Sequence, residues 1–235
     1  MAYEFSGRVR YSEINEEGKL SLSSLVNYFQ DVSTFQSEQL GVGLAYMKER
    51  HIAWVLSSWQ IVIHRYPLLG ETVISQTWPY DFNTFFGMRN FTLLDENRNY
   101  LARANSVWAL IDVDRQRPIR CPEEILDKYP TEACLDMEYA PRKVPIPEGG
   151  VKEPSFMIGK HMLDTNHHVN NGQYIALAGA YMPENFQVRQ LRAEYKMQAR
   201  LHDVMLPIVS IREDQVTVAL CNEKERPYAV VEFQK

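Results

Sequence analysis

The sequence is poor in cysteine, and this scarcity excludes several classes of protein. Among 235 residues there are three cysteines, Cys121, Cys134 and Cys221, an odd number at wide spacing. A disulfide-stabilised secreted domain carries paired cysteines at close spacing, so we expect a reducing compartment. No Cys-x-x-Cys pair or histidine–cysteine cluster has the spacing of metal ligands, and we therefore expect neither a metal nor a cofactor.

Long apolar runs and strong charge are also missing. No stretch approaches the ~18 apolar residues of a membrane span. Residues 1–8 have neither the basic start and apolar core of a signal peptide nor an Arg- and Ser-rich transit pattern. A net charge of −5 gives no reason to expect a nucleic acid partner. We therefore predict a cytoplasmic protein without a membrane span.

The composition is that of a globular protein, and its first helix can be located. Hydrophobic residues make up 45% and charged residues 23% of the chain, which is ordinary for a protein with a large core. Ser21 or Ser23 can cap a helix that Gly41 can end. Its apolar residues recur on one helical face, namely Leu22, Leu25, Val26, Phe29 and Val32.

The same order of elements occurs twice. Residues 52–113 alternate as antiparallel strands do, with a polar hairpin loop at 95–99. Prolines and glycines at 140–154 are typical of a linker, after which a short strand, a polar loop, a helix stopped by Pro183 and further strands follow. Glu13-Ile14-Asn15 is a faint echo of Asp164-Thr165-Asn166.

This order predicts an α+β double hotdog, in which two tandem units each wrap an antiparallel sheet around a long central helix. We place the first unit at 1–139, the linker at 140–154 and the second unit at 155–235. The second helix should carry Tyr174, Leu177, Ala178 and Tyr181 on one face.

The polar loop before the second helix has the residues of a hydrolytic site. Asp164, Asn166 and His168 stand at alternate positions and can converge at the helix N-terminus. Asp164 or His168 can act as general acid or base, and the Asn166 amide can hold a carbonyl or a water. Backbone N–H groups of the first turn would stabilise an oxyanion, those of Asn170, Asn171 and Gly172. Single Asp or Asn residues here would be ordinary caps; the combination favours a site.

With these residues the chain resembles the acyl-acyl-carrier-protein thioesterases of plants and bacteria. Their second half carries an Asp-x-Asn-x-His-Val-Asn-Asn-x-x-Tyr signature, which residues 164–174 match. The resemblance implies a double hotdog that hydrolyses fatty acyl thioesters on acyl carrier protein, releasing free fatty acid and ending chain elongation. It also implies that Asp164, Asn166 and His168 are catalytic.

The chain departs from this family further on. Plant members commonly have a Glu-Cys pair where this sequence has Gln198-Ala199. A cysteine nucleophile is therefore excluded at this position, although the Gln198 amide can orient water. We expect direct attack by water, with the choice of base between Asp164 and His168 left open.

The partner and the acyl pocket are further expectations. Acyl carrier protein is acidic, so basic residues of the second half are expected to dock it: Arg189, Arg192, Lys196 and Arg200. The acyl chain should bind in the first unit, and each candidate contact also fits plain core: Val26, Phe29, Phe35, Trp54, Leu56, Trp59 and Phe85. The chain is expected to be a monomer or a homodimer.

Two other functions compete with hydrolysis. A hotdog enoyl-thioester hydratase resembles this chain but has Asp-x-Asn-Pro-x-His, whereas the spacing from Asp164 to His168 is shorter by one residue and no proline intervenes. A non-catalytic acyl-binding hotdog is the second alternative, because Gln198 and Ala199 replace the Glu-Cys pair.

Overall fold

The computed structural model describes residues 2–235 and divides into two compact units. The first unit comprises the chain up to Ser57 together with Ile63–Tyr139, and the second comprises Ser58–Val62 and Ala140–Lys235. The segment predicted as a linker therefore belongs to the second unit. Val144, within it, is 3% exposed in an apolar cluster of that unit.

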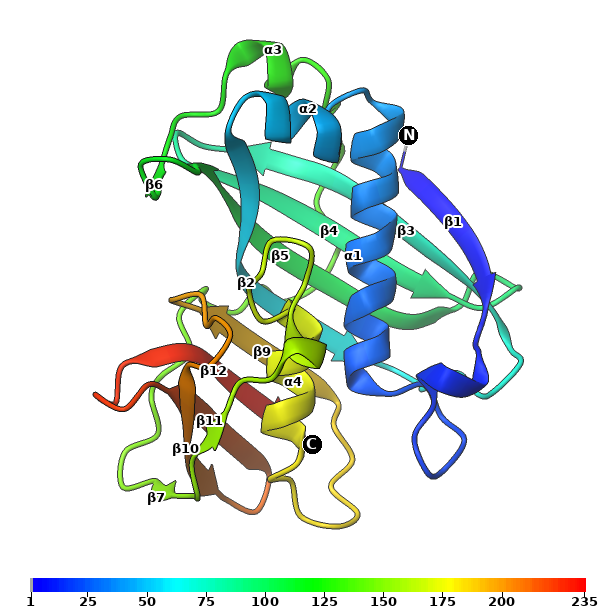
Figure 1. Cartoon of the computed structure of the whole chain (residues 1–235). Helices are drawn as coiled ribbons and strands as arrows, with labels where there is room; N and C mark the ends of the chain where they lie inside the picture. Colours follow the sequence, from blue (N-terminus) through cyan, green and yellow to red (C-terminus); the bar gives the residue numbers. More distant parts are fainter. Residues whose placement is uncertain (1) are drawn as a thin grey trace. The chain divides into compact units, whose positions relative to one another are not determined.

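The first unit is an antiparallel sheet with one long helix against it (Figure 1). Its elements in chain order are β1 (Tyr3–Arg8), η1 (Tyr11–Glu13), α1 (Leu22–Gln39), α2 (Leu44–Glu49), β2 (Ile52–Ile63), β3 (Thr72–Phe82), β4 (Phe86–Leu94), β5 (Tyr100–Asp112), β6 (Arg117–Pro118) and α3 (Glu123–Leu126). The strand order is β1-β3-β4-β5-β2. Burial alternates along β3 as expected for a strand with one covered face, and α1 packs against β3 and β1.

The predicted boundaries of α1 are confirmed. The Ser21 hydroxyl accepts the backbone N–H of Ser24 at 3.2 Å, which caps the first turn. Leu25, Val26 and Phe29 are buried on the predicted face. Just beyond the helix, Gly41 has a φ of 73°, a left-handed conformation that glycine adopts without strain.

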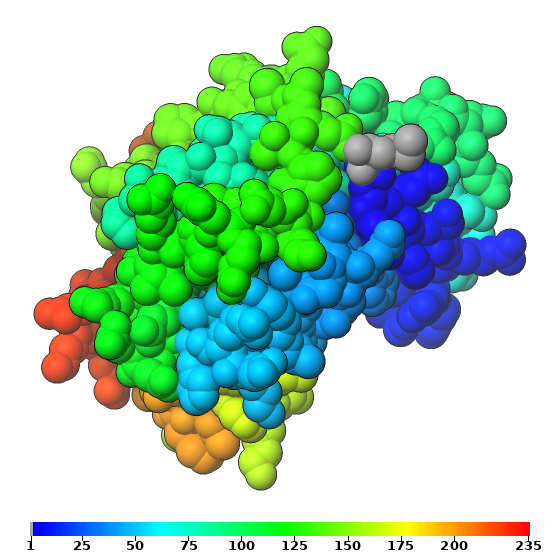
Figure 2. All heavy atoms as spheres, turned by 90° about the horizontal axis from the view of Figure 1, so that it is seen from above, coloured from blue at the N-terminus to red at the C-terminus, as the bar shows by residue number. Residues whose placement is uncertain are grey.

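Short helices close one end of the first unit. Tyr46 Oη on α2 donates to Glu124 Oε1 on α3 at 3.0 Å, and Met47 and Ile125 are buried in a shared apolar cluster. Figure 2 shows the light-blue atoms of the α2 region beside the green atoms of the α3 region. The first unit therefore has a capped end that is built from both helices.

The second unit repeats this strand order. It contains β7 (Val151–Lys152), β8 (Phe156–Met157), η2 (Lys160–Met162), α4 (Asn171–Gly179), β9 (Gln190–Tyr195), β10 (Val204–Ile211), β11 (Gln215–Cys221) and β12 (Pro227–Gln234). The order β8-β10-β11-β12-β9 corresponds to β1-β3-β4-β5-β2 of the first unit. Ser58–Val62 of β2 pairs with β9, and α4 packs against β11 and β12. The predicted α+β architecture, in which antiparallel strands pack against a helix in each unit, is confirmed.

The second helix is shorter than predicted. α4 has 9 residues against 18 in α1, and Tyr181, which we placed on its face, lies beyond its end. Pro183 has no N–H to donate and disfavours helical geometry in the residue before it, so the chain leaves the helix early.

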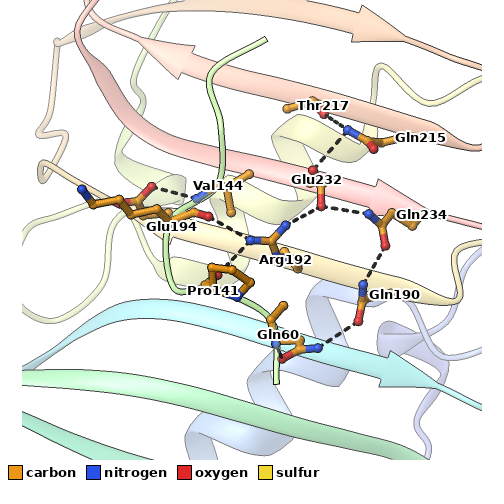
Figure 3. Close-up of polar contacts among 12 residues, drawn as sticks. Gln60, Pro141, Val144, Gln190, Arg192, Glu194, Gln215, Thr217, Glu232 and Gln234 are labelled. Atoms are coloured by element: carbon orange, nitrogen blue, oxygen red, sulfur yellow. Dashed lines mark hydrogen bonds and ion pairs between the residues drawn. The ribbon is translucent and has the colours of Figure 1, made fainter. Parts of the chain in front are cut away.

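A chain of polar contacts crosses the strands of the second unit on one face (Figure 3). Arg192 Nη1 lies 3.0 Å from Glu232 Oε1, and Arg192 Nη2 donates to the carbonyls of Pro141 and Lys143 at 2.8 Å each. Glu194 Oε2 accepts the Val144 N–H at 3.0 Å. These bonds fasten the proline-rich segment to the sheet of its own unit.

Candidate active site

A tight turn precedes α4, and the side chain of Asp164 builds it. The Asp164 N–H donates to the His168 carbonyl at 2.8 Å, and the His167 N–H donates to the Asp164 carbonyl at 3.1 Å. Asp164 Oδ1 accepts the backbone N–H groups of Asn166 at 2.8 Å and His168 at 3.2 Å. His167 takes the left-handed conformation, with φ of 61°. One carboxylate oxygen is therefore committed to the turn, which brings Asp164, Asn166 and His168 onto one short loop.

The first turn of α4 uses two of the three amides that we assigned to an oxyanion. Asn170 caps the helix, because its Oδ1 accepts the Gly172 N–H at 2.8 Å. The Asn170 N–H donates to the Met162 carbonyl at 3.0 Å. Asn171 opens the helix, and its carbonyl accepts the Tyr195 hydroxyl at 3.0 Å. The N–H groups of Asn170 and Gly172 thus already have acceptors, so the assignment of these two amides needs correction.

The segment around Gln198 lies directly beside this loop. The Val169 N–H donates to the Ala199 carbonyl at 3.0 Å, and the Ala199 N–H donates to the Tyr174 hydroxyl at 3.0 Å. Tyr174, the last residue of the signature, is 2% exposed. Gln198 is exposed next to this buried anchor. The residue next to Gln198 therefore pairs with the loop, and the auxiliary role of Gln198 stays a prediction.

The environment of His168 favours its neutral form. His168 is half-buried, and this burial is the main cause that lowers its pKa; the positive charge of Arg200 lowers it further, and Asp164 acts in the opposite direction. His168 and Arg200 face each other in an antiparallel bridge. Sequence reasoning missed this influence of Arg200, because thirty-two positions separate the two residues and only the folded sheet joins them.

The first unit contains the same turn with different side chains. Asn15 Oδ1 accepts the backbone N–H groups of Glu17 at 3.1 Å and Lys19 at 3.0 Å. The Asn15 N–H donates to the Lys19 carbonyl at 2.8 Å, and Gly18 has a φ of 73°. Asn15 is therefore the counterpart of Asp164. The predicted echo, which matched Glu13 to Asp164, is wrong by two residues.

The predicted acyl contacts fall into different environments. Val26 and Phe29 are fully buried in the first unit, and the Phe29 ring lies 5.3 Å from that of Phe91. Trp54 is half-buried, whereas Trp59 is 1% exposed in the β2 segment that belongs to the second unit. Two further candidates prove exposed instead of enclosed, Phe35 at 38% and Phe85 at 47%.

Two of the four basic residues predicted to dock a carrier protein are committed within the fold. The Arg192 side chain is 12% exposed and paired with Glu232, so its assignment to docking is corrected. Lys196 Nζ lies 3.0 Å from Glu194 Oε2. Arg189 and Arg200 are exposed. Two residues of the basic run are therefore paired with acidic side chains of their own unit.

Within residues 2–235, no group of three or more His, Cys, Asp or Glu side chains is placed to hold a metal ion. Over the same residues, no helix combines the length and the apolar character that a membrane crossing requires.

Comparison with known proteins relates this chain to a family of thioesterases. The family model described as the acyl-ACP thioesterase N-terminal domain matches residues 2–129. A chloroplastic acyl-acyl-carrier-protein hydrolase of Cuphea viscosissima is 25% identical over 227 residues, which are 90% of this chain and 55% of the relative. Oleoyl-acyl carrier protein thioesterase 1 of Arabidopsis thaliana is 24% identical over 228 residues, 87% of this chain and 62% of that protein. This chain thus spans little more than half the length of these relatives.

Solved structures share the fold over the whole chain. A putative oleoyl thioesterase from Lactobacillus plantarum superposes with a TM-score of 0.87 at 22% identity, covering 100% of this chain and 95% of that one. An acyl-ACP thioesterase from Bacteroides thetaiotaomicron gives 0.89 at 21% identity, covering 99% and 97%. These likenesses establish the double hotdog fold.

Proposed function

Because the chain belongs to the acyl-ACP thioesterase family, we propose that it hydrolyses the thioester between a fatty acyl group and acyl carrier protein. The products are the free fatty acid and the carrier protein's thiol, and the release ends chain elongation. The match of the family model to residues 2–129 carries this proposal. The second unit supports it with a polar turn that places an imidazole, an amide and a carboxylate on one loop.

His168 is the base in this proposal. Its pKa is lowered, chiefly by burial, so the imidazole is neutral near pH 7 and can accept a proton. It takes a proton from water while the water oxygen bonds to the thioester carbon. The carbon–sulfur bond then breaks, and the imidazolium returns its proton to the sulfur. Atoms and charges balance without a covalent enzyme intermediate.

Asp164 is a positioning residue in this scheme. Its Oδ1 holds the turn by accepting two backbone N–H groups, and its negative charge acts on His168 in the direction that favours the imidazolium. The carboxylate therefore stabilises the charge that develops when His168 takes the proton. In this scheme the imidazole of His168 activates the water, and Asp164 orients the imidazole.

The remaining roles fall to amide groups. Asn166 is exposed on the loop, and its side-chain N–H groups can donate to the carbonyl oxygen as negative charge develops there. The positive end of α4 adds a favourable field for this charge. Gln198, exposed beside Ala199, can orient the attacking water.

The substrate's other contacts are part of the same proposal. Val26, Phe29, Trp54 and Trp59 are the candidates for contact with the acyl chain, and acyl carrier protein is the proposed partner. Arg189, Lys196 and Arg200 are exposed, and we propose that they contribute to docking it. A cytoplasmic location remains a prediction from the sequence.

The test is release of fatty acid from acyl carrier proteins that carry saturated chains of increasing length. Purified wild-type protein should release fatty acid with a dependence on chain length, and His168→Ala should lose most of this activity. Lys19→Ala, at the corresponding position of the first unit, is the matched control. Tight binding without turnover would point to an acyl-binding protein, and a hydroxyacyl product from enoyl substrates would point to a hydratase.

A further inference from the structure

In the second unit, the segment after β9 is attached through its backbone to the loop before α4. The Ala199 carbonyl accepts the Val169 N–H at 3.0 Å. The next residue, Arg200, faces His168 in an antiparallel bridge, and the Arg200 N–H donates to Asp203 Oδ2 at 2.8 Å. Ala199 is therefore the point at which this segment joins the loop, and its position determines where Arg200 lies relative to His168.

The first unit makes the same attachment at its own turn. The Pro67 carbonyl accepts the Leu20 N–H at 2.9 Å. The next residue, Leu68, faces Lys19 in an antiparallel bridge, and the Leu68 N–H donates at 3.0 Å to a carboxylate three residues further along the chain, as in the second unit. Pro67 is therefore the counterpart of Ala199.

The two attachments differ in one hydrogen bond. The Ala199 N–H donates to the Tyr174 hydroxyl on α4 at 3.0 Å, and both residues are buried. Pro67 has no N–H to donate. The counterpart of Tyr174 in α1 is Leu25, because each is the fourth residue after the cap of its helix, and Leu25 is equally buried but apolar. The backbone attachment therefore forms in the first unit without a tyrosine hydroxyl.

A second tyrosine supports the ring of Tyr174. The Tyr195 ring packs edge-on against it, with 5.7 Å between the ring centres, and the Tyr195 hydroxyl donates to the Asn171 carbonyl in the first turn of α4 at 3.0 Å. Tyr195 is the last residue of β9, and the last residue of β2 is Ile63, which has no hydroxyl. Both tyrosine hydroxyl bonds are thus features of the second unit, beside the proposed catalytic loop.

We infer that Tyr174 is a positioning residue for the proposed hydrolysis and acts through Ala199. Its hydroxyl holds the Ala199 N–H and thereby fixes the two neighbours of Ala199 in the chain. One neighbour is Gln198, proposed to orient the attacking water, and the other is Arg200, which faces His168. This inference rests on the proposed function and adds a residue to the same site.

The pKa of His168 reports on this positioning without any hydrolysis. Burial lowers this pKa most, the charges of Arg200 and His167 lower it further, and the charge of Asp164 raises it. Asp164 is held by hydrogen bonds within its own loop, so loosening the segment after β9 leaves it in place. Such loosening reduces the burial of His168 and the influence of Arg200, and the pKa of His168 should therefore rise.

The experiment combines an NMR titration of His168 with the kinetics of acyl-ACP hydrolysis in Tyr174→Phe, which removes only the hydroxyl. His168→Ala identifies the imidazole signal by its loss. In Tyr174→Phe the pKa of His168 should rise toward the ordinary value of about 6.5. The kcat should fall by about tenfold while KM stays within about twofold, because substrate still binds but the water and the base are misplaced. Tyr129→Phe, which removes a buried tyrosine hydroxyl from the first unit, should change neither the pKa nor kcat.

A double variant separates positioning from stability. Tyr174→Leu leaves the buried Ala199 N–H without its acceptor, so the melting temperature should fall. Adding Ala199→Pro removes that N–H and reproduces the pair of the first unit, Leu25 and Pro67. The double variant should therefore recover part of the melting temperature, whereas kcat should stay low.

Recovery of kcat together with the melting temperature would show that Tyr174 only supports the fold and would overturn the inference. An unchanged pKa of His168 in Tyr174→Phe would overturn it as well. If wild-type protein cleaves no thioester, the proposed hydrolysis fails, whereas a raised pKa of His168 in Tyr174→Phe would still support positioning by Tyr174.

Discussion

The turns that precede α1 and α4 can be compared bond by bond. In each, the side-chain oxygen of the first residue accepts the backbone N–H groups two and four positions on, from Asn15 in the first unit and from Asp164 in the second. In each, the fourth residue is left-handed, Gly18 or His167. An uncharged amide and a carboxylate thus build the same turn.

The side chains that the two turns present are different. In the first, Glu17 and Lys19 pair at 2.6 Å in solvent, where such a pair contributes little. In the second, Asn166 and His168 take these positions, and the imidazole is half-buried with a lowered pKa. The comparison separates the turn, which both units share, from the proposed catalytic side chains, which only the second unit has.

The largest expected effect is the loss of the imidazole. His168→Ala should lower kcat/KM for acyl-ACP hydrolysis by about 10²- to 10⁴-fold, the usual contribution of a general base. Lys19→Ala should leave the rate within about twofold of wild type, because a substitution far from a catalytic group changes little. Comparable losses in the two variants would mean that the first turn also takes part in the reaction.

The next effect tests what the carboxylate adds to the scaffold. Asp164→Asn should preserve the turn, because Asn15 makes the same hydrogen bonds in the first unit. Hydrolysis should still fall on the order of tenfold, since the charge that stabilises the imidazolium is gone and one pKa unit corresponds to about a factor of ten. The melting temperature tests whether the turn is preserved, and steady-state rates measure the loss of hydrolysis. Full activity in Asp164→Asn would limit Asp164 to building the turn.

A pH profile should distinguish His168 as the base. Because its pKa is lowered, the neutral imidazole persists below the ordinary value of about 6.5, and the acid limb of kcat/KM should lie below that pH. Arg200→Gln removes one of the charges that lower the pKa of His168, so the acid limb should move to higher pH. Added salt should reduce the difference in the pH of this limb between wild type and Arg200→Gln. The lowered pKa also affects folding. Because His168 binds a proton more readily in the unfolded chain than in the folded one, the free energy of unfolding should decline as the pH falls through the ordinary pKa of histidine. An acid limb at the same pH in wild type and Arg200→Gln would argue against His168 as the base.

The smallest expected effect compares the two helix caps. Ser21→Ala and Asn170→Ala each remove a side-chain acceptor of a backbone N–H, and each should lower the free energy of unfolding by about 1 kcal/mol. Chemical denaturation measures both. Only Asn170→Ala should also slow hydrolysis, because only that cap adjoins the proposed site. Equally slow hydrolysis by Ser21→Ala would contradict the proposal that only the second unit has the catalytic loop.

Local sequence patterns located the helices and strands correctly. They were less reliable for the length of a helix and for matching the residues of one unit to those of the other. The apolar spacing from Leu25 to Val32 specified α1, because a helical face repeats within the chain itself. The echo between the two turns was misaligned, because Glu13 is a carboxylate like Asp164 while the true counterpart, Asn15, is revealed only by its hydrogen bonds. The length of α4 was overestimated, since apolar spacing continues to Tyr181 although the helix ends at Gly179.

The sequence by itself determined which residues are available for chemistry, the two units with a helix and antiparallel strands in each, and the absence of a cysteine at position 199. It could do so because periodicity, turn residues and motif spacing are local properties of the chain. The tertiary structure alone decided how these groups are used. It placed Arg200 beside His168, committed the N–H groups of Asn170 and Gly172 to other acceptors, tied Arg192 to Glu232, and joined Ala199 to the Tyr174 hydroxyl. Burial and pairing depend on residues brought together from distant parts of the chain, and no local pattern encodes them.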